Sequence, residues 1–285
     1  MTPPILSGLK TRFTKNAQTT KSRKVKDLFS VAGKVALVTG GSRGIGLMIA
    51  RGLVENGVRT YISSRSAEAC DEAVAELAAH GDCVALPADL SRMEEVERLA
   101  GEIIAREDKL DILVNNAGAA WGAQIGEVPE IGWDKVMDLN AKSLFFLSQA
   151  LLPSLEAAGT NDDPARIINI GSVDGLAIPK LETYSYPASK AAVHHLTRVL
   201  AHQLGKRNIT VNAIAPGPFE SKMMDYTLAN YRDDIEQTLP RGRLGTPEDI
   251  AGTVIYLSSR AGAYTTGVVI PVDGGSLVAN GLWQT

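Results

Sequence analysis

The chain has little cysteine, few aromatic residues and no long uninterrupted apolar segment. Its two cysteines, Cys70 and Cys83, are too few for a disulfide scaffold and lack the spacing of metal ligands. No apolar run approaches the ~20 residues that cross a bilayer. The net charge of −3 gives no support for a nucleic-acid-binding surface. These absences favour a cytoplasmic protein without a membrane, nucleic-acid or metal partner.

Positive charge is concentrated at the start of the chain. Residues 1–26 contain seven basic residues and no acidic ones. We therefore predict a basic extension over residues 1–30, serving as a mobile arm or a subunit contact, with organelle targeting as an alternative. The 45% hydrophobic content of the chain is enough for one substantial core. Residues 31–285 are predicted to form a single domain.

Short apolar runs rich in β-branched residues alternate with amphipathic helical patterns along that domain. Such alternation predicts right-handed crossovers and a parallel sheet covered by helices on both faces, an α/β doubly wound fold. The expected strands are residues 34–39, 58–64, 83–89, 111–117, 165–172, 209–216 and 267–272.

Two segments predict where helices begin. Ser91-x-x-Glu94 and Thr246-Pro-Glu-Asp249 each place a capping side chain ahead of first-turn carboxylates. A long irregular connection, residues 217–245, reads as a lid over a ligand site, with a helical surface excursion as the structural alternative.

A glycine turn follows the first expected strand directly. It reads Gly40-Gly-Ser-Arg-Gly44-Ile-Gly46 and leads into a helical pattern. Glycines permit a tight turn and close backbone approach, while the free N–H groups and the positive helix end attract a pyrophosphate. A purely structural turn is the alternative, but the strand and helix on either side favour a dinucleotide site.

Tyr186-Pro-Ala-Ser-Lys190 sets a phenol and an ammonium on one helix face. A nearby positive charge favours the phenolate, which predicts a lowered pKa and a role in proton transfer. Tyr184 is six residues from Lys190 and would point elsewhere. A surface helix pair is the alternative if the motif is taken alone.

Together these features resemble the short-chain dehydrogenase/reductase family, from about Val31 to about Gly275. The motifs in family order are Thr39-Gly-x-x-x-Gly44-x-Gly46, Asp89-Leu90, Asn115-Asn-Ala-Gly118, Asn140, Gly171-Ser172, Tyr186-x-x-x-Lys190 and Pro216-Gly217. The resemblance implies a Rossmann-type, mainly seven-stranded sheet and hydride exchange at a carbonyl or alcohol carbon.

The resemblance also implies a role for each site residue. Tyr186 would protonate the developing alkoxide, and Ser172 would donate a hydrogen bond to the same oxygen. Lys190 would hold ribose hydroxyls and bias Tyr186, and Asn140 would anchor a water that links the lysine to solvent. Taken alone, Ser172 could be a strand end and Asn140 a helix kink.

The cofactor is predicted from the residues after the second expected strand. A carboxylate there would select NAD, whereas this chain has Ser64-Arg65. Arg43 in the glycine turn adds a second guanidinium, and guanidinium groups suit phosphate recognition. We therefore predict NADP(H) as the cofactor; the alternative is that both arginines are ordinary surface charges. The expected contacts are Gly40, Ser42, Arg43, Gly44, Ile45, Gly46, Ser64, Arg65, Asp89, Leu90, Asn116, Ala117, Gly118, Tyr186, Lys190, Pro216, Gly217, Phe219 and Ser221.

His194, His195 and His202 on the same expected helix invite a metal interpretation, but neighbouring histidines point about 100° apart and no acidic ligand is near. We predict helix packing or subunit contact for them and no metal site.

The substrate is less readable. The chain resembles 3-oxoacyl thioester (β-ketoacyl) reductases. Enoyl reductases of the superfamily have six residues between tyrosine and lysine, a spacing that neither Tyr184 nor Tyr186 has relative to Lys190. Arg207 could meet an acidic carrier protein, but two acids in the 159–164 segment would repel it. The alternative substrates are a small ketone, a sugar or a polyol. The alternative function is that of a regulatory protein that binds NADP without catalysing a reaction. The family also implies a homotetramer.

Overall fold

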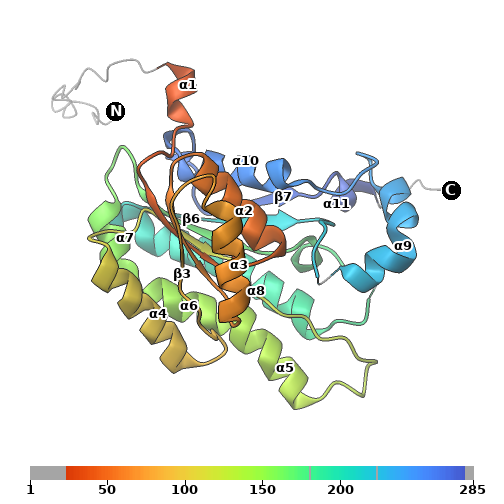
Figure 1. Ribbon diagram of the computed structural model, residues 1–285. Coiled ribbons are helices and arrows are strands. Elements are labelled where there is room, and N and C mark those ends of the chain that lie inside the picture. Colours follow the sequence, from red (N-terminus) through yellow and green to blue (C-terminus); the bar gives the residue numbers. More distant parts are fainter. Residues whose placement is uncertain (1–23, 180, 223, 280–285) are drawn as a thin grey trace, which may run out of the picture.

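The computed structural model describes residues 24–179, 181–222 and 224–279. Most of the basic extension therefore lies outside the described residues. The described chain contains a seven-stranded parallel sheet of order β3-β2-β1-β4-β5-β6-β7 (Figure 1). Its strands are β1 Val35–Thr39, β2 Arg59–Ser63, β3 Cys83–Ala85, β4 Ile112–Asn115, β5 Ala165–Ile170, β6 Ile209–Pro216 and β7 Val269–Val272. The predicted parallel, doubly wound architecture is confirmed.

Helices cover both faces of this sheet (Figure 1). On one face lie α2 (Gly44–Glu55), α3 (Ala67–Leu77) and α10 (Pro247–Ser258). On the other lie α4 (Met93–Arg106), α6 (Ser143–Ala150), α7 (Leu152–Ala158) and α8 (Ser185–Leu204). The remaining helices are α1 Val25–Leu28, α5 Glu130–Met137, α9 Asp225–Thr238 and α11 Ser276–Ala279, with short turns η1 Asp138–Lys142, η2 Val173–Gly175, η3 Gly205–Arg207 and η4 Arg260–Gly262.

Two separate hydrophobic clusters follow from the alternation of side chains along the strands. Leu37, Leu113 and Ile167 lie in register and point into the cluster beneath α4 and α8. Their neighbours Val38, Val114 and Ile168 point into the opposite cluster beneath α2 and α10. Because both faces are covered, the strands read as continuous apolar runs in the sequence.

The strand order reverses next to β1. The chain runs outward from β1 to β2 and β3 and then returns to place β4 on the other side of β1. Ligands of open α/β sheets bind in the crevice at the carboxyl ends of strands around such a reversal. This edge of the sheet carries the glycine turn after β1 and Asn116 after β4.

One predicted helix start is confirmed and one is wrong. At α10, Thr246 and Asp249 form a reciprocal capping box, with Pro247 as the first helical residue. At α4 the cap position is Arg92 rather than Ser91, and no side chain caps the helix. The Ser91 hydroxyl instead donates to Asp89 Oδ1 at 2.8 Å, so it stabilises the loop before the helix.

The segment 217–245 contains the 14-residue helix α9, which stands at the edge of the molecule (Figure 1). The helix is kinked at Tyr231 and has no buried side chain. Its base is closed by a parallel bridge between Phe219 and Gly245, and the Gly245 N–H donates to Pro218 O at 3.0 Å. The segment is therefore a helical excursion with anchored ends, and its role as a lid stays a prediction.

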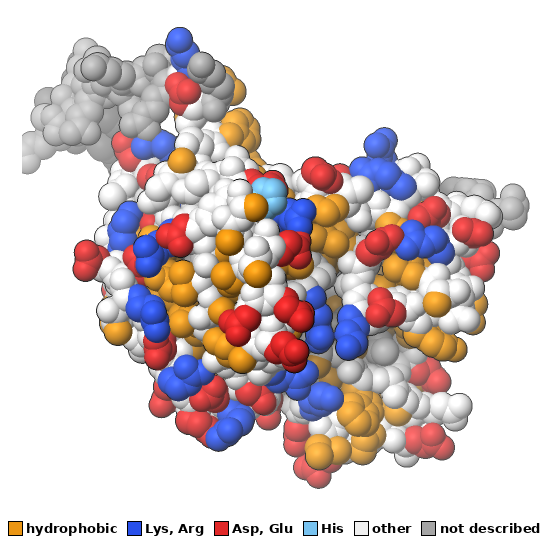
Figure 2. Space-filling view, viewed as in Figure 1, with side chains coloured by type: hydrophobic (Ala, Val, Ile, Leu, Met, Phe, Trp, Pro, Cys, Tyr) orange, Lys and Arg blue, Asp and Glu red, His pale blue; other side chains and the backbone are white. Residues whose placement is uncertain are grey.

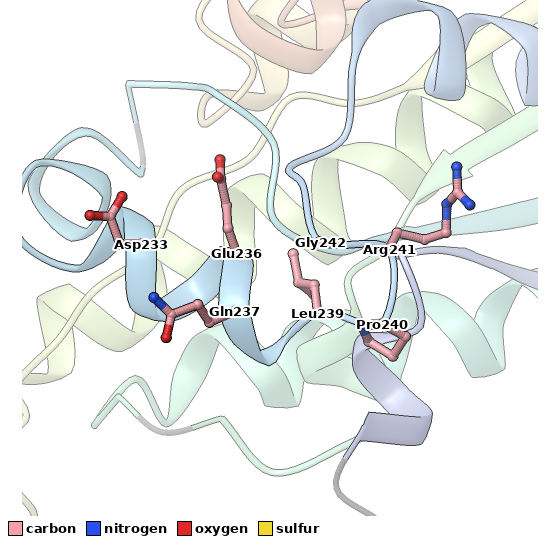
Figure 3. Close-up of a pocket in the computed structure, with 7 residues that line it drawn as sticks. All are labelled: Asp233, Glu236, Gln237, Leu239, Pro240, Arg241 and Gly242. Atoms are coloured by element: carbon pink, nitrogen blue, oxygen red, sulfur yellow. The ribbon is translucent and has the colours of Figure 1, made fainter.

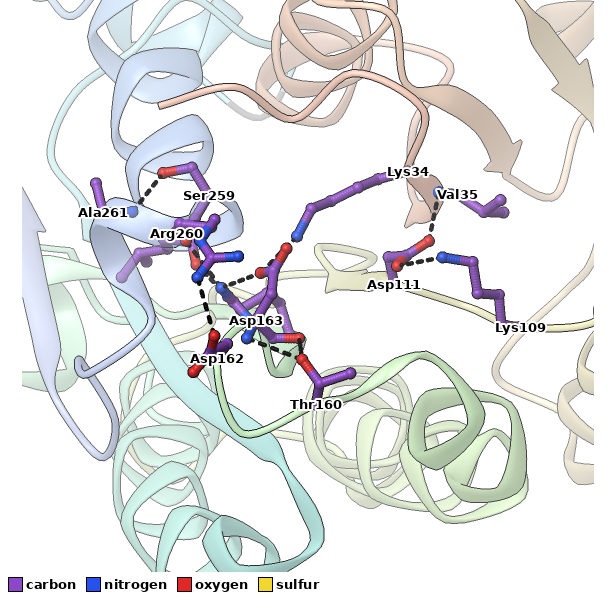
Figure 4. Close-up of polar contacts among 12 residues, drawn as sticks. Lys34, Val35, Lys109, Asp111, Thr160, Asp162, Asp163, Ser259, Arg260 and Ala261 are labelled. Carbon is purple, nitrogen blue, oxygen red and sulfur yellow. Dashed lines mark hydrogen bonds and ion pairs between the residues drawn. The ribbon is translucent and has the colours of Figure 1, made fainter. Parts of the chain in front are cut away.

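A polar cluster lies at the amino-terminal ends of the strands, opposite the glycine turn. Figure 4 shows Lys34 and Asp163 of this cluster directed toward each other. Asp163 Oδ1 accepts from Lys34 Nζ at 2.9 Å and from Arg166 Nη2 at 3.0 Å. The buried Arg166 also donates to Leu257 O at 2.7 Å and to Ser259 O at 2.8 Å. Asp163 is thus the shared anion of two cations.

This cluster alters the electrostatic argument about a carrier protein. Asp163 is paired internally, and Asp162 lies 3.6 Å from Arg260. Arg207, the base predicted to meet the carrier, is itself paired with Glu156. Both acids of the 159–164 segment have a cationic partner, although Asp162 is exposed, so the predicted repulsion of an acidic partner is weaker than the sequence suggested.

Within the described ranges, no helix combines the length and the apolar character that a membrane crossing requires.

Candidate active site

Tyr186 and Lys190 lie one turn apart near the start of α8, as their spacing predicted. Lys190 Nζ is 5.6 Å from the centroid of the Tyr186 ring. The lysine is only 5% exposed, and its Nζ donates to Ile170 O, the last residue of β5, at 2.8 Å. An ammonium has three donors, so this bond orients Lys190 while leaving it capacity for other acceptors.

The pKa of Tyr186 moves in the direction opposite to the sequence-based prediction. Burial raises the pKa of Tyr186 to about 12, a hydrogen bond with Ser172 works against this shift, and the charge of Asp174 adds to it. Burial also lowers the pKa of Lys190 to about 8. Desolvation is the largest cause of both shifts. The phenol is therefore held in its protonated form at neutral pH, which suits a proton donor.

Ser172 stands immediately beyond β5 and is 7% exposed. It caps the short turn η2, because its Oγ accepts a hydrogen bond from the Asp174 N–H at 3.1 Å. The turn packs on α8: a Cβ added to Gly175 would lie 2.8 Å from the backbone carbon of Lys190. Ser172 is thus fixed beside the helix that carries Tyr186 and Lys190.

Asn140 lies in η1, a π-helical turn between α5 and α6. Its Oδ1 accepts from the Ala119 N–H at 2.8 Å, and its Nδ2 donates to Ala119 O at 3.0 Å and to Ser189 Oγ at 2.9 Å. These bonds join the loop after β4 to α8. Both interpretations of Asn140 are compatible with this placement, because it occupies a helix irregularity and faces the site.

The glycine turn has the shape required for a pyrophosphate. Gly40 and Gly44 have φ of 66° and 52°, and a Cβ on Gly46 would lie 2.1 Å from Gly40 O. Arg43 occupies the cap position of α2 and makes no side-chain cap, so the first N–H groups of the helix are open to a ligand. The residues present therefore fit a dinucleotide phosphate group.

Thr39, which sequence reasoning included only as part of a motif, links the two central strands. Its Oγ1 accepts from the Asn116 N–H at 2.9 Å and the Ala117 N–H at 3.0 Å. Asn116 Nδ2 returns a bond to Thr39 O at 2.8 Å. A Cβ on Gly118 would lie 3.3 Å from Asn140 Oδ1 and 3.7 Å from Lys190 Nζ. The predicted cofactor segment and the predicted catalytic residues therefore meet at Gly118.

The residues expected to choose the cofactor lie at the ends of β1 and β2. Ser64 directly follows β2, and Arg65 and Arg43 are exposed, with no ion pair to any acid among the described residues. Asp89 accepts from the Ser91 N–H at 3.2 Å, and Leu90 is buried. Two unpaired guanidiniums near one turn are available for an anionic group.

Residues after β6 approach the glycine turn. Ser221 Cβ lies 3.2 Å from the position of a Cβ on Gly44. The Gly217 N–H donates to Val272 O at 2.9 Å, which holds the chain against β7 just after Pro216. Phe219 is buried at 2% exposure. The structure therefore brings the predicted start of the lid to the helix end where the phosphate would lie.

Figure 2 shows the surface hollowed between α9 and the body of the molecule, with basic side chains along the hollow. Two cavities lie along the 217–245 segment. One of about 440 Å³ is lined by residues of α9 and the turn after it (Figure 3). Another of about 380 Å³ lies under Phe219 beside β7. Neither is lined by Ser172, Tyr186 or Lys190.

The three helix histidines do not converge. His194 is buried behind the Ser172 segment, where a Cβ on Gly171 would lie 2.0 Å from its Nε2, whereas His195 is exposed. Burial lowers the pKa of His194. Helix packing is therefore its evident role.

A family model described as Enoyl-(Acyl carrier protein) reductase matches residues 40–276. The "Rhamnolipids biosynthesis 3-oxoacyl-[acyl-carrier-protein] reductase" of Pseudomonas aeruginosa is 51% identical over 253 residues, covering 87% of this chain and 97% of the relative. "Gluconate 5-dehydrogenase" of Gluconobacter oxydans is 36% identical over 264 residues, covering 89% and 98%.

Among solved structures, the "Pseudomonas aeruginosa RhlG/NADP active-site complex" is similar with a TM-score of 0.85 and 49% identity, covering 88% of this chain and 99% of that one. These matches extend over the glycine turn, the Tyr186 helix and the strands between them. The chain belongs to the short-chain dehydrogenase/reductase family.

Proposed function

We propose that the chain is an NADPH-dependent carbonyl reductase that converts a 3-oxoacyl thioester to the 3-hydroxyacyl product. The observation that carries this proposal is the convergence of Asn140, Ser172, Tyr186 and Lys190 at the sheet edge that bears the glycine turn. NADPH, when bound, would supply the hydride, and the protein must orient the ketone and deliver a proton.

Tyr186 is the proposed proton donor. Its raised pKa keeps the hydroxyl protonated until charge develops on the substrate oxygen. Ser172 would donate to the same oxygen, since its position is set by the Asp174 N–H and by the packing of η2 on α8. These two hydroxyls stabilise charge at the place where the reaction creates it.

Lys190 and Asn140 are proposed to support the donor. Lys190 is held by Ile170 O and would bind ribose hydroxyls with its remaining donors. Asn140 is held by Ala119 and Ser189 and would anchor a water on the route from Lys190 to solvent. Their burial keeps this route narrow, so proton exchange would follow a defined path.

NADP(H) is the proposed cofactor because Ser64 and Arg65, rather than an acidic residue, follow β2, and Arg43 in the glycine turn adds a second unpaired guanidinium. Guanidinium groups bind phosphate through paired hydrogen bonds, and a carboxylate at this point would repel the phosphate. The relative of known structure in complex with NADP supports the same choice.

The double substitution Arg43→Ala/Arg65→Ala should raise the KM for NADPH by roughly 100-fold and change that for NADH by less than threefold. The reason is that only NADPH carries the phosphate that these side chains would bind. Initial rates with NADPH and with NADH measure the effect. Arg51→Ala, on the helix α2 that follows the glycine turn, is the control. An equal loss with both cofactors would contradict the assignment.

The substrate proposal is supported by the 51% identical 3-oxoacyl reductase and by the four-residue spacing of Tyr186 and Lys190. A small ketone, sugar or polyol remains the second candidate, favoured by the similarity to gluconate 5-dehydrogenase. A silent NADP-binding regulatory protein is the third, and the assembled Ser172, Tyr186 and Lys190 argue against it.

A substrate panel separates these functions. We expect NADPH oxidation with acetoacetyl thioesters at a kcat/KM at least about tenfold above that for keto sugars or for polyol oxidation with NADP⁺. Turnover of polyols alone would support the second candidate. Cofactor binding without turnover of any member would support the regulatory protein and contradict the proposal.

We propose that the protein forms a homotetramer and that it is located in the cytoplasm. Leu144, Leu147 and Val193 are buried within the subunit, whereas Phe146 and Val199 on α6 and α8 remain 37% and 43% exposed. Exposed apolar side chains on these two helices are available for contact between copies.

A further inference from the structure

One acidic side chain in the site has been given no contact with the substrate. Asp174 is the middle residue of the turn η2, which Ser172 caps. Its backbone N–H donates to Ser172 Oγ at 3.1 Å, so its position is tied to the hydroxyl that would contact the substrate oxygen. Among the described residues, no lysine or arginine forms an ion pair with its carboxylate.

The surroundings of Asp174 are poorly solvated. The residue is half-buried, and burial raises the pKa of its carboxyl group. It lies two residues from Ser172 in a turn that packs on the backbone of Lys190, and its charge contributes to the raised pKa of Tyr186. The ionisable groups of α8 that lie near this turn are Tyr186, Lys190 and His194, and Lys190 donates to Ile170 O.

The residues that follow the turn are apolar and open to solvent. Leu176, Ile178 and Leu181 are 43%, 95% and 62% exposed. These side chains offer hydrophobic contact for an acyl chain. The carboxylate at the turn offers no favourable contact to an anion.

We propose that Asp174 is a specificity-determining residue whose charge, beside Ser172 and Tyr186, rejects substrates with a negative charge near the reacting carbonyl and so selects neutral 3-oxoacyl esters and thioesters over keto acids. This inference rests on the proposed carbonyl reduction. A 3-keto acid would place a second carboxylate close to that of Asp174, and the repulsion between the two would oppose its binding.

Ethyl acetoacetate and acetoacetate form the matched probe pair. Both carry the same 3-oxo group, and only the second is charged at neutral pH. Two like charges several ångströms apart at a partly buried site change kcat/KM by roughly ten- to fiftyfold. The readout is the ratio of kcat/KM for the ester to that for the acid, measured with NADPH on the full chain.

Wild type should prefer the ester by at least about tenfold. Asp174→Asn should raise kcat/KM for acetoacetate relative to that for the ester by about tenfold or more, because any change at Tyr186 affects both probes alike and cancels in the ratio. Asp174→Glu should keep the wild-type ratio because it restores the charge. Glu182→Gln is the matched control: Glu182 is an exposed acid in the following segment that accepts from Tyr184 at 3.1 Å, and its removal should leave the ratio unchanged.

An unchanged ratio in Asp174→Asn would overturn the inference, as would equal losses with both probes or an equal change in Glu182→Gln. The failure of the proposed function has a different signature. Wild type would then fail to reduce ethyl acetoacetate and the thioesters at all. Reduction of the neutral ester with a ratio insensitive to residue 174 counts only against the role of Asp174.

Discussion

Tyr186→Phe is expected to lower kcat by roughly 10²- to 10⁴-fold while leaving NADPH affinity within about threefold of wild type. The substitution removes only the hydroxyl that would protonate the developing alkoxide. The ring, which lies 5.6 Å from Lys190 Nζ, keeps its packing. Steady-state rates with a 3-oxo substrate and fluorescence titration with NADPH measure the two effects separately.

Tyr184→Phe provides the matched control for this prediction. Tyr184 lies two residues earlier, and its hydroxyl donates to Glu182 Oε1 at 3.1 Å rather than facing Lys190. We expect its kcat to stay within about twofold of wild type. Equal losses in the two variants, or normal turnover by Tyr186→Phe, would remove Tyr186 from the role of proton donor.

Asp163→Asn should lower the free energy of unfolding by about 3 kcal/mol. Its carboxylate is shared by Lys34 and Arg166, whose side chains are 11% and 1% exposed. Removing the anion leaves two cations close together with little access to water. Urea unfolding monitored by circular dichroism gives the difference, provided that both proteins unfold in one transition.

Asp162→Asn is the control for the stability prediction. Asp162 is 67% exposed and lies 3.6 Å from Arg260, so its loss should change the free energy of unfolding by less than about 1 kcal/mol. If the two variants were equally stable, the cluster around Asp163 would be an exposed surface network rather than a buried tie between strands.

The central strands β1, β4, β5 and β6 could be predicted from sequence because every residue in them is buried and each reads as a largely apolar run. Their ends could not be located as well. The predicted strand 83–89 is shorter in the structure, where β3 ends at Ala85, although the N–H groups of Leu86 and Ala88 still donate to Ile62 O and Ser64 O. Within residues 217–245 a helical excursion was only the alternative interpretation, and the bounds of α9 could not be predicted because the helix buries no side chain and has no apolar period to detect.

In the site, the spacing of residues along the chain predicted which side chains share a helix face, but the sequence did not show how deeply each side chain is buried. The four-residue interval placed Tyr186 and Lys190 on one face, and the glycine pattern placed the turn after β1. The predicted direction of the Tyr186 pKa shift was wrong because burial, which the sequence does not show, is the largest cause and raises the pKa. Asp174 was missed for the same reason: only the fold brings its charge to the phenol.

The most direct test is a crystal structure of the chain with NADP⁺ and a 3-oxo ligand. The account predicts that the phenolic oxygen of Tyr186 lies about 2.6–3.2 Å from the ketone oxygen, with the ketone carbon facing the nicotinamide ring. A nicotinamide bound away from Tyr186, or a phenol directed elsewhere in that complex, would contradict it.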